Sequence, residues 1–206
     1  METIDCIQGT DEWFAAKLGI ASASNFAKIK AKPRVAGKGG RVDYMYQLEN
    51  ERDEGKTEET INTTHMMRGV EIEPQAREYY EKFQGVTVEQ VGFIKLDDNI
   101  GCSPDGLVGK DGLIEIKCPK GTTHKKYVVK DKLPTTYIPQ VQGQLWVTNR
   151  KWCDFISYRP ESNERPYWSI RVFRDEGYIN QLAVEVNQFI IELEALTKKI
   201  INCPFE

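Results

Sequence analysis

The sequence predicts an α/β fold of the α+β kind, a mixed sheet flanked by helices, formed as a single domain over residues 1–206. Three observations support this. Helical and strand-like patterns follow one another in blocks, as expected for a sheet covered by helices. The length suffices for one sizeable core, and 40% of the residues are apolar. No internal repeat, low-complexity tract or linker divides the chain.

The first part of the chain is predicted to be helical. Ser22 or Ser24 is suited to cap the second helix, and Gly85 is a natural stop for the fourth. Pro74 either kinks the fourth helix or lies in the first turn of a new one. The predicted helices span residues 11–18, 22–30, 42–52 and 64–83.

Strands dominate the second part of the chain, with one helix predicted between them at residues 139–148. The strand patterns cover residues 87–96, 106–109, 113–117, 152–158 and 167–173. A last helix is predicted over residues 179–201, where apolar side chains recur every three or four positions along one face. We expect this face to pack in the core, with a subunit contact as the alternative. Its residues are Leu182, Val186, Phe189, Leu193, Leu196 and Ile200.

Composition excludes several classes of function. No apolar run approaches the roughly 20 residues that span a bilayer, and the first residues do not resemble a signal peptide. Five cysteines without CxxC spacing suit a reducing cytosol better than a disulfide framework or a zinc site. The two histidines, His65 and His124, lie far apart, which argues against a histidine-based metal site or a Ser-His-Asp triad.

Charged residues are distributed unevenly along the chain, although the net charge of −3 does not by itself indicate nucleic-acid binding. Residues 28–41 contain six basic side chains and no acid, whereas acids outnumber bases in residues 49–59. Such segregation creates a local field that could meet a polyanion. Two solvated loops are the alternative explanation.

A hairpin at residues 103–119, "SPDGLVGKDGLIEIKCP", carries the strongest chemical signal. The turn at Gly109–Gly112 lets Asp105 approach Glu115, and strand alternation places Glu115 and Lys117 on one face. Two close carboxylates favour a cation between them. Oxygen ligands without histidine or cysteine favour Mg²⁺ or Mn²⁺, and a lysine beside them suits hydrolysis of a phosphodiester.

The alternative for this hairpin is a surface turn with a chance aspartate and an ordinary Glu–Lys pair, because short motifs recur by chance. The context favours the chemical interpretation. Glu115 and Lys117 lie within an apolar strand, "LIEIKCP". Burying charged side chains there costs folding free energy, so their presence indicates a function.

The spacing of "PD" and "E-x-K" resembles the PD-(D/E)xK nuclease superfamily, whose core resembles that of restriction endonucleases. The segments "CSPDGL", "GLIEIKCP", "VQGQLWVT" and "WFAAKLGIASAS" together resemble the viral recombination nucleases of the lambda exonuclease type. The resemblance covers most of the chain, from about Trp13 to the last helix. The first two segments belong to one hairpin motif, and three separated motifs in the family's order are more specific than the three-letter signature alone.

The resemblance implies roles for individual residues. Asp105 and Glu115 match the metal-binding acids, the main-chain carbonyl of Ile116 a further ligand, and Lys117 the catalytic lysine. Glu73, in "RGVEIEPQAR", matches an additional catalytic and metal-binding acid. Sequence alone favours the alternative that Glu73 forms an ion pair with the residue four positions later, on a solvated helix face.

Further positions match a pocket for the 5′ phosphate of the digested strand: Lys17, Ser24, Ser103 and Gln140. The family has arginine where this chain has Lys17, which keeps the charge but loses bidentate geometry. Without the resemblance, the sequence pattern indicates a helix cap for Ser24 and an ordinary polar helix residue for Gln140. We also expect the basic segment to contact the DNA backbone through Lys32, Arg34 and Lys38.

The resemblance implies a Mg²⁺-dependent 5′→3′ exonuclease with two ions in each active site, where Mn²⁺ can substitute. It would digest one strand of duplex DNA from an end and leave a 3′ single strand for recombination. A ring-shaped homotrimer, a phage single-strand annealing protein as partner, and a phage or prophage protein in the bacterial cytoplasm are also implied. The alternatives are a structure- or site-specific endonuclease of the same superfamily and a DNA-end binding protein without catalysis.

Overall fold

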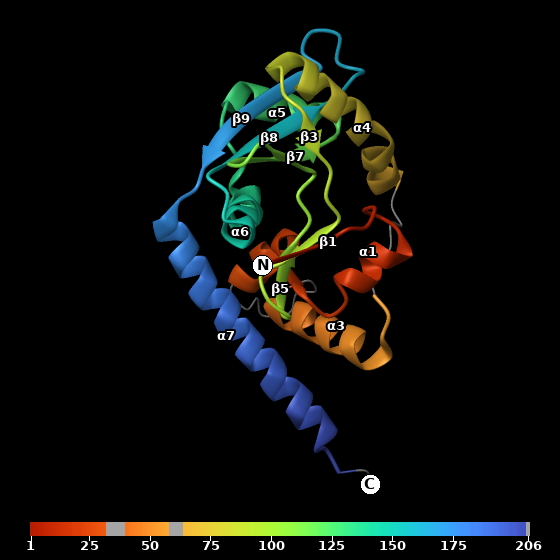
Figure 1. Cartoon of the computed structure of the whole chain (residues 1–206), viewed down its shortest axis with the longest axis vertical. Helices are drawn as coiled ribbons and strands as arrows, with labels where there is room; N and C mark the ends of the chain where they lie inside the picture. The colour runs from red at the N-terminus through yellow and green to blue at the C-terminus, as the bar shows by residue number, and fades with distance from the viewer. Residues whose placement is uncertain (32–39, 58–63, 205–206) are drawn as a thin grey trace.

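The computed structural model describes residues 1–31, 40–57 and 64–204. It contains two mixed sheets with helices packed around them (Figure 1). The predicted fold class, a mixed sheet flanked by helices, is confirmed, although the strands are divided between two sheets.

The larger sheet has the strand order β3-β6-β7-β8-β9. β7 and β8 run parallel, and the other neighbouring pairs are antiparallel. Its last four strands match predicted ones, because each is bounded by turn residues and rich in β-branched or aromatic side chains. The strands are β3 (Val88–Glu89), β6 (Gly106–Val108), β7 (Gly112–Lys117), β8 (Trp152–Tyr158) and β9 (Tyr167–Phe173).

The smaller sheet has the order β1-β4-β5-β2 and joins segments that are distant in sequence. β2 and β5 are parallel, and the other pairs are antiparallel. None of these strands is longer than three residues, so they carry almost no periodic signal, and only β4 falls within a predicted strand. The strands are β1 (Glu2–Ile4), β2 (Ala21–Ser22), β4 (Phe93–Lys95) and β5 (Ile100–Cys102).

The strand predicted over residues 87–96 is in fact two strands in different sheets, β3 and β4. The break lies at Gly92, where the chain passes very close to residues 4–6. A Cβ atom on Gly92 would lie 2.4 Å from the Cys6 sulfur and 2.5 Å from the Cys6 carbonyl oxygen. Only glycine allows this approach, so the prediction of one continuous strand was wrong for a steric reason.

The helices agree with the predicted ones, with two exceptions: α5 and the short η2 were not predicted, and the helix predicted over residues 22–30 is divided into η1, which contains Ser24, and α2. Ser22 precedes a short 3₁₀ helix but makes no capping hydrogen bond; Pro74 lies inside α4; and Gly85 follows α4 with φ 66°. The helices are α1 (Asp11–Ala16), η1 (Ala23–Asn25), α2 (Phe26–Lys30), α3 (Arg41–Glu54), α4 (Thr64–Gln84), α5 (Gly121–Lys130), η2 (Thr135–Tyr137), α6 (Ile138–Thr148) and α7 (Glu176–Ile201).

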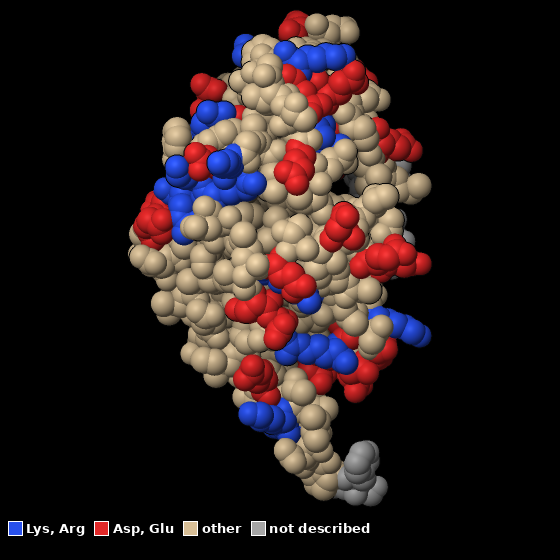
Figure 2. Space-filling model, viewed as in Figure 1, with Lys and Arg blue, Asp and Glu red and all other residues tan. Residues whose placement is uncertain are grey.

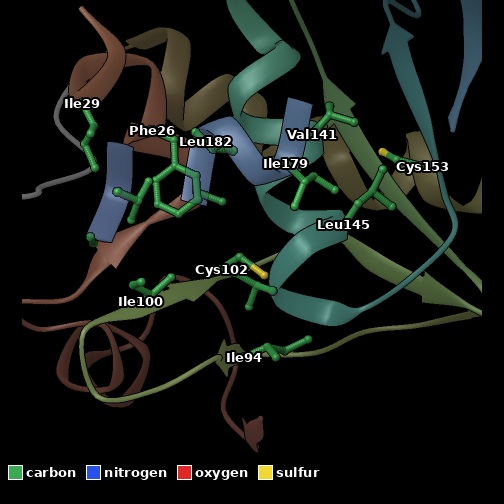
Figure 3. Packing of buried hydrophobic residues seen from close by; sticks show 14 of the residues in the cluster. Phe26, Ile29, Ile94, Ile100, Cys102, Val141, Leu145, Cys153, Ile179 and Leu182 are labelled. Atoms are coloured by element: carbon green, nitrogen blue, oxygen red, sulfur yellow. The ribbon is translucent and has the colours of Figure 1, made fainter. Parts of the chain in front are cut away.

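The core consists of two apolar clusters, and β7 lies between them. On one face, Ile114 and Ile116 pack with α4, including Tyr80. On the other, Leu113 belongs to a larger cluster that α2, α6 and α7 share with the strands (Figure 3). The predicted inward orientation of Ile114 and Ile116 is therefore confirmed, and every residue of β7 before Lys117 is buried.

The apolar stripe of α7 packs into the core as far as Leu193, which is fully buried. Beyond that point the helix extends past the body of the molecule, and Ile200 is 43% exposed (Figure 1). The core role expected for the stripe holds for its first two thirds. Within the described ranges, no helix has both the length and the apolar composition of a membrane span.

Candidate active site

The hairpin of β6 and β7 brings Asp105 beside the strand that carries Glu115 and Lys117. Gly106 pairs with Ile114, and the Asp105 main-chain N–H donates to the Ile114 carbonyl oxygen at 3.2 Å. The Asp105 carboxylate accepts a hydrogen bond from the main-chain N–H of Ile116 at 2.5 Å. The turn and the strand alternation thus produce the proximity that the sequence predicts.

Glu115 is nearly inaccessible to solvent, with 1% of its surface exposed. Two glutamines one turn apart on α6 hold its carboxylate. Gln140 donates to one oxygen at 2.7 Å, and Gln144 donates to the other at 2.6 Å. Lys117 forms an ion pair with the first oxygen. Burying a carboxylate is costly without such donors, and α6 therefore fixes the position of the Glu115 carboxylate.

Lys117 lies at the end of β7, where the strand reaches the surface and 27% of the side chain is exposed. Burial lowers the pKa of its ammonium group, but Glu115 and Asp105 outweigh this and raise the pKa above its ordinary value. The ammonium also lies 5.3 Å from the centre of the Tyr137 ring. Lys117 is therefore a cation at neutral pH and suited to stabilising negative charge.

Glu73 reaches the same site from α4. It forms an ion pair with Arg77, and the Arg77 guanidinium also donates to the main-chain oxygen of Asp105 at 3.2 Å. Burial raises the pKa of Glu73, Arg77 lowers it, and Glu115 raises it further. The ion pair that sequence alone favours is present, and the structure adds that this pair lies against the hairpin.

The acids repel one another. Burial raises the pKa of Asp105 well above its ordinary value, and the neighbouring charges of Glu115 and Glu73 raise it further. A cation between these groups would relieve the repulsion. Burial and the charge of Glu73 raise the pKa of the nearby Cys118 thiol to about 11, so this sulfur stays protonated at neutral pH in the metal-free protein.

The donor set fits a hard divalent cation, because it consists of carboxylates and a main-chain carbonyl. These side chains are not preorganised as a set of metal ligands. Within residues 1–31, 40–57 and 64–204, no three His, Cys, Asp or Glu side chains lie close enough together to hold an ion. A cation that used Glu115 as a ligand would also have to compete with Lys117 and the two glutamines.

A cleft of about 960 Å³ opens beside Asp105 and Glu73 and is also lined by Trp13 and Ser24. The Trp13 indole N–H donates to the Ser103 hydroxyl oxygen at 2.8 Å. The Lys17 ammonium lies 4.3 Å from the centre of the Trp13 ring, and 8% of Lys17 is exposed. Trp13 thus connects two of the residues expected at the 5′ phosphate with the cleft.

Among the other described residues expected to bind the 5′ phosphate or the DNA backbone, only one lines the cleft. Ser24 is exposed in the cleft and hydrogen-bonded to Ser22 at 3.0 Å. The Gln140 amide is engaged with Glu115. Three residues expected to contact the DNA backbone lie outside the described residues: Lys32, Arg34 and Lys38.

Comparison with known proteins decides the family. The model of the YqaJ-like viral recombinase domain matches residues 12–151. The chain belongs to this YqaJ-like family. The membership confirms the resemblance to viral recombination nucleases that the sequence motifs indicate. No curated protein sequence matches the chain.

Solved structures agree with this membership. The YqaJ-like chain is 40% identical to an alkaline exonuclease, LHK-Exo from Laribacter hongkongensis, with a TM-score of 0.86 over 93% of this chain and 96% of that one. A structure of LHK-Exo in complex with dAMP matches equally well. A phage-related exonuclease from Haemophilus somnus 129PT, 14% identical, has a TM-score of 0.63 over 88% of this chain and 95% of that one, which shows the fold alone. The PD-(D/E)xK core is thus confirmed.

Sequence reasoning assigned no role to three residues of the YqaJ-like site: Trp13, Arg77 and Gln144. The sequence pattern indicates Arg77 only as an ion-pair partner of Glu73. Gln144 follows Gln140 by four positions, so a shared helix face could have indicated that both reach one target. No local pattern reveals the contact between Trp13 and Ser103, because they are 90 residues apart in the chain.

We expect Gln144→Leu to lower the free energy of unfolding of the metal-free YqaJ-like protein by about 1–3 kcal/mol, because one oxygen of buried Glu115 loses its donor. Urea unfolding in EDTA measures this. Gln188→Leu is the matched control, since Gln188 donates to Glu192 four residues later on an exposed face. That change should stay within about 0.5 kcal/mol. Equal effects of the two changes would contradict the role assigned to Gln144.

Proposed function

We propose that this chain is a divalent-metal-dependent 5′→3′ exonuclease that digests one strand of duplex DNA from an end. It leaves a 3′ single strand for recombination by strand annealing. The observation that carries the proposal is that Asp105 and Glu73 line a cleft in a YqaJ-like fold, while the charges of Glu115 and Lys117 lie close enough to act on Asp105. The 40% identity to an alkaline exonuclease supports it.

In this proposal, Asp105, Glu115, Glu73 and the main-chain carbonyl of Ile116 would hold Mg²⁺, and Mn²⁺ could substitute. Two ions in each site would supply Lewis acidity and charge neutralisation at the phosphodiester. Lys117 stabilises the negative charge that develops on the scissile phosphate, because it remains protonated at neutral pH. The amides of Gln140 and Gln144 hold the Glu115 carboxylate in its orientation.

The 5′ end of the strand would bind where Trp13, Ser24 and Ser103 approach the cleft. The Ser103 oxygen accepts from Trp13, which leaves its own hydroxyl proton for a phosphate oxygen. Lys17 supplies the charge in this pocket. Binding of a nucleotide by a relative, LHK-Exo with dAMP, is consistent with a product of this kind.

The wider assignment rests on the family relationship. We propose a single nuclease domain that assembles as a ring-shaped homotrimer around DNA. A phage single-strand annealing protein would receive the 3′ strand in the cytoplasm of the bacterial host. The basic segment with Lys32, Arg34 and Lys38 would contact the DNA backbone.

A covalently closed circle separates this function from the endonuclease of the same superfamily. Linear duplex should be degraded completely in Mg²⁺, whereas the closed circle made from the same DNA should remain intact. Cleavage of the circle at a comparable rate would contradict end-dependence. Binding of linear DNA without any cleavage in Mg²⁺ or Mn²⁺ would instead identify an end-binding protein.

Recognition of the 5′ terminus gives a separate prediction. A terminal phosphate is a dianion near neutral pH, with three acceptor oxygens. Duplex with a 5′ phosphate should therefore be digested faster than the same duplex with a 5′ hydroxyl, in a time course of nucleotide release. Lys17→Ala should reduce this ratio mainly by slowing the phosphorylated substrate, and Lys17→Arg should keep it. An unchanged ratio in Lys17→Ala would exclude this pocket as the reader of the phosphate.

A further inference from the structure

The segment that follows the catalytic strand is strongly basic. Residues 117–130, "KCPKGTTHKKYVVK", contain five lysines and no acid, in a chain whose net charge is −3. The segment forms the loop after β7 and then α5, the helix that sequence analysis missed. Its charge therefore begins at Lys117 itself and continues along the surface next to the site.

The exposed lysines lie together on the outward side of α5 and at its two ends. The inward side is formed by His124, Tyr127 and Val128, which pack against the sheet and core. Lys125 and Lys126 follow His124 by one and two positions and Lys130 follows Val128 by two, so the helical repeat turns them away from the inward side, and all three are exposed. We name the lysine face by its five exposed members: Lys120, Lys125, Lys126, Lys130 and Lys132.

The lysine face lacks the ion pairs that neutralise other basic side chains. In the described part of the chain, none of its five ammonium groups lies within 4 Å of a carboxylate oxygen. Several basic residues elsewhere on helices are paired, for example Lys30 with Glu185 and Lys82 with Glu78. On the face that Figure 2 draws, most basic side chains likewise lie beside acidic ones.

The acids bordering the lysine face are mostly engaged with other groups. Asp131 accepts from the Trp168 indole N–H at 2.9 Å, and Glu161 is paired with Arg68 at 2.7 Å. Glu164, in the loop between β8 and β9, is the exception. A hollow of about 420 Å³ separates this loop from α5 and is lined by both Lys125 and Arg159. The positive charge is thus left available to an external anion.

The lysine face is close enough to the site to meet the same DNA molecule. Tyr127, on the inward side of α5, contacts Phe155, and Phe155 contacts Tyr137, whose ring lies beside the Lys117 ammonium. The outer side of the helix is therefore about one helix diameter, roughly 10 Å, from this aromatic group. Duplex DNA carries one charge per about 1.7 Å of its axis, so a duplex bound at the active site has several phosphates within about 10 Å of the scissile bond, the distance that separates the lysine face from the aromatic group beside Lys117.

We propose that the lysine face of α5 binds the phosphate backbone of the duplex that enters the active site. The inference rests on the proposed function and adds a binding surface to it. Its contacts are sequence-independent, since ammonium groups meet phosphates as point charges. Their contribution to affinity must therefore fall steeply with salt.

The test compares two adjacent pairs of exposed lysines, Lys125–Lys126 on α5 and Lys198–Lys199 in the last turn of α7. Affinity for a blunt duplex is measured by fluorescence anisotropy in Ca²⁺ over a series of KCl concentrations. In K125A/K126A the slope of log affinity against log salt should become shallower by up to about 1.8, or about 0.9 for each lost phosphate contact. K198A/K199A should keep the wild-type slope.

The outcomes separate the two proposals. If wild type binds and digests duplex DNA but K125A/K126A retains its slope, the lysine face is a solvated surface. Equal losses in both double variants would show a general effect of charge and would also overturn the inference. If wild type does not bind duplex DNA, the proposed function itself fails. Thermal melting of each variant verifies that the fold is intact.

Discussion

Asp105→Asn is expected to reduce the rate of Mg²⁺-dependent DNA cleavage on the order of a thousandfold or more. The variant loses several kcal/mol of transition-state stabilisation by the metal, and about 1.4 kcal/mol corresponds to a factor of ten in rate. The asparagine oxygen can still accept the hydrogen bond from the Ile116 N–H, so the hairpin should remain folded. Nucleotide release from linear duplex measures the effect. Near-normal cleavage by the variant would contradict the role of Asp105.

The same substitution should stabilise the metal-free protein. Burial and the charges of Glu115 and Glu73 raise the pKa of Asp105 in the folded state. The folded protein therefore binds the Asp105 proton more tightly than the unfolded chain, where the pKa is about 3.9. This favours folding at acidic pH and is lost as the pH rises through the folded-state pKa. In EDTA, the melting temperature of Asp105→Asn should thus exceed that of wild type increasingly toward neutral pH, and added Mg²⁺ should stabilise only wild type.

Lys117→Ala is expected to lower turnover about 10²–10³-fold, the usual cost of removing one group that stabilises transition-state charge. Binding to DNA ends in Ca²⁺ should be largely retained, because the other contacts remain. Lys110→Ala is the matched control, since Lys110 is an exposed lysine in the turn of the same hairpin. It should leave both quantities unchanged. A lower melting temperature with normal turnover in Lys117→Ala would show that Lys117 is only an ion-pair partner of Glu115.

The hairpin could be predicted from the sequence because its geometry is local. A short turn and the two-residue period of a strand suffice to bring Asp105, Glu115 and Lys117 together. The strand β9 and the helix α7 were predictable for the same reason, since each has a sustained period, whereas β8 is an almost fully buried run that its apolar and aromatic residues indicate.

The rest of the site depends on packing between distant segments. Glu73 is four residues before Arg77, and a solvated ion pair on a helix surface has the same sequence pattern. Only the packing of α4 against β7 brings Glu73 to the acids of the hairpin. The two glutamines of α6 likewise reach Glu115 only through the fold, 25 and 29 residues along the chain.

Missed elements had weak local signals. The strands of the smaller sheet have two or three residues each, too few for a period to be visible. α5 begins with glycine and two threonines and contains two adjacent valines, all poor helix formers, so its low propensity concealed the buried residues at helical spacing. Tertiary packing of Tyr127 and Val128 compensates for this.

The central claim, a 5′→3′ exonuclease acting at duplex ends, is tested most directly by digesting one linear duplex labelled either at its 5′ ends or at its 3′ ends in Mg²⁺. We predict that the 5′ label is released first as a mononucleotide, while the 3′-labelled strand shortens progressively and keeps its label. Asp105→Asn should release neither label. Early release of the 3′ label, or internal fragments from both substrates at the start of the reaction, would contradict the account.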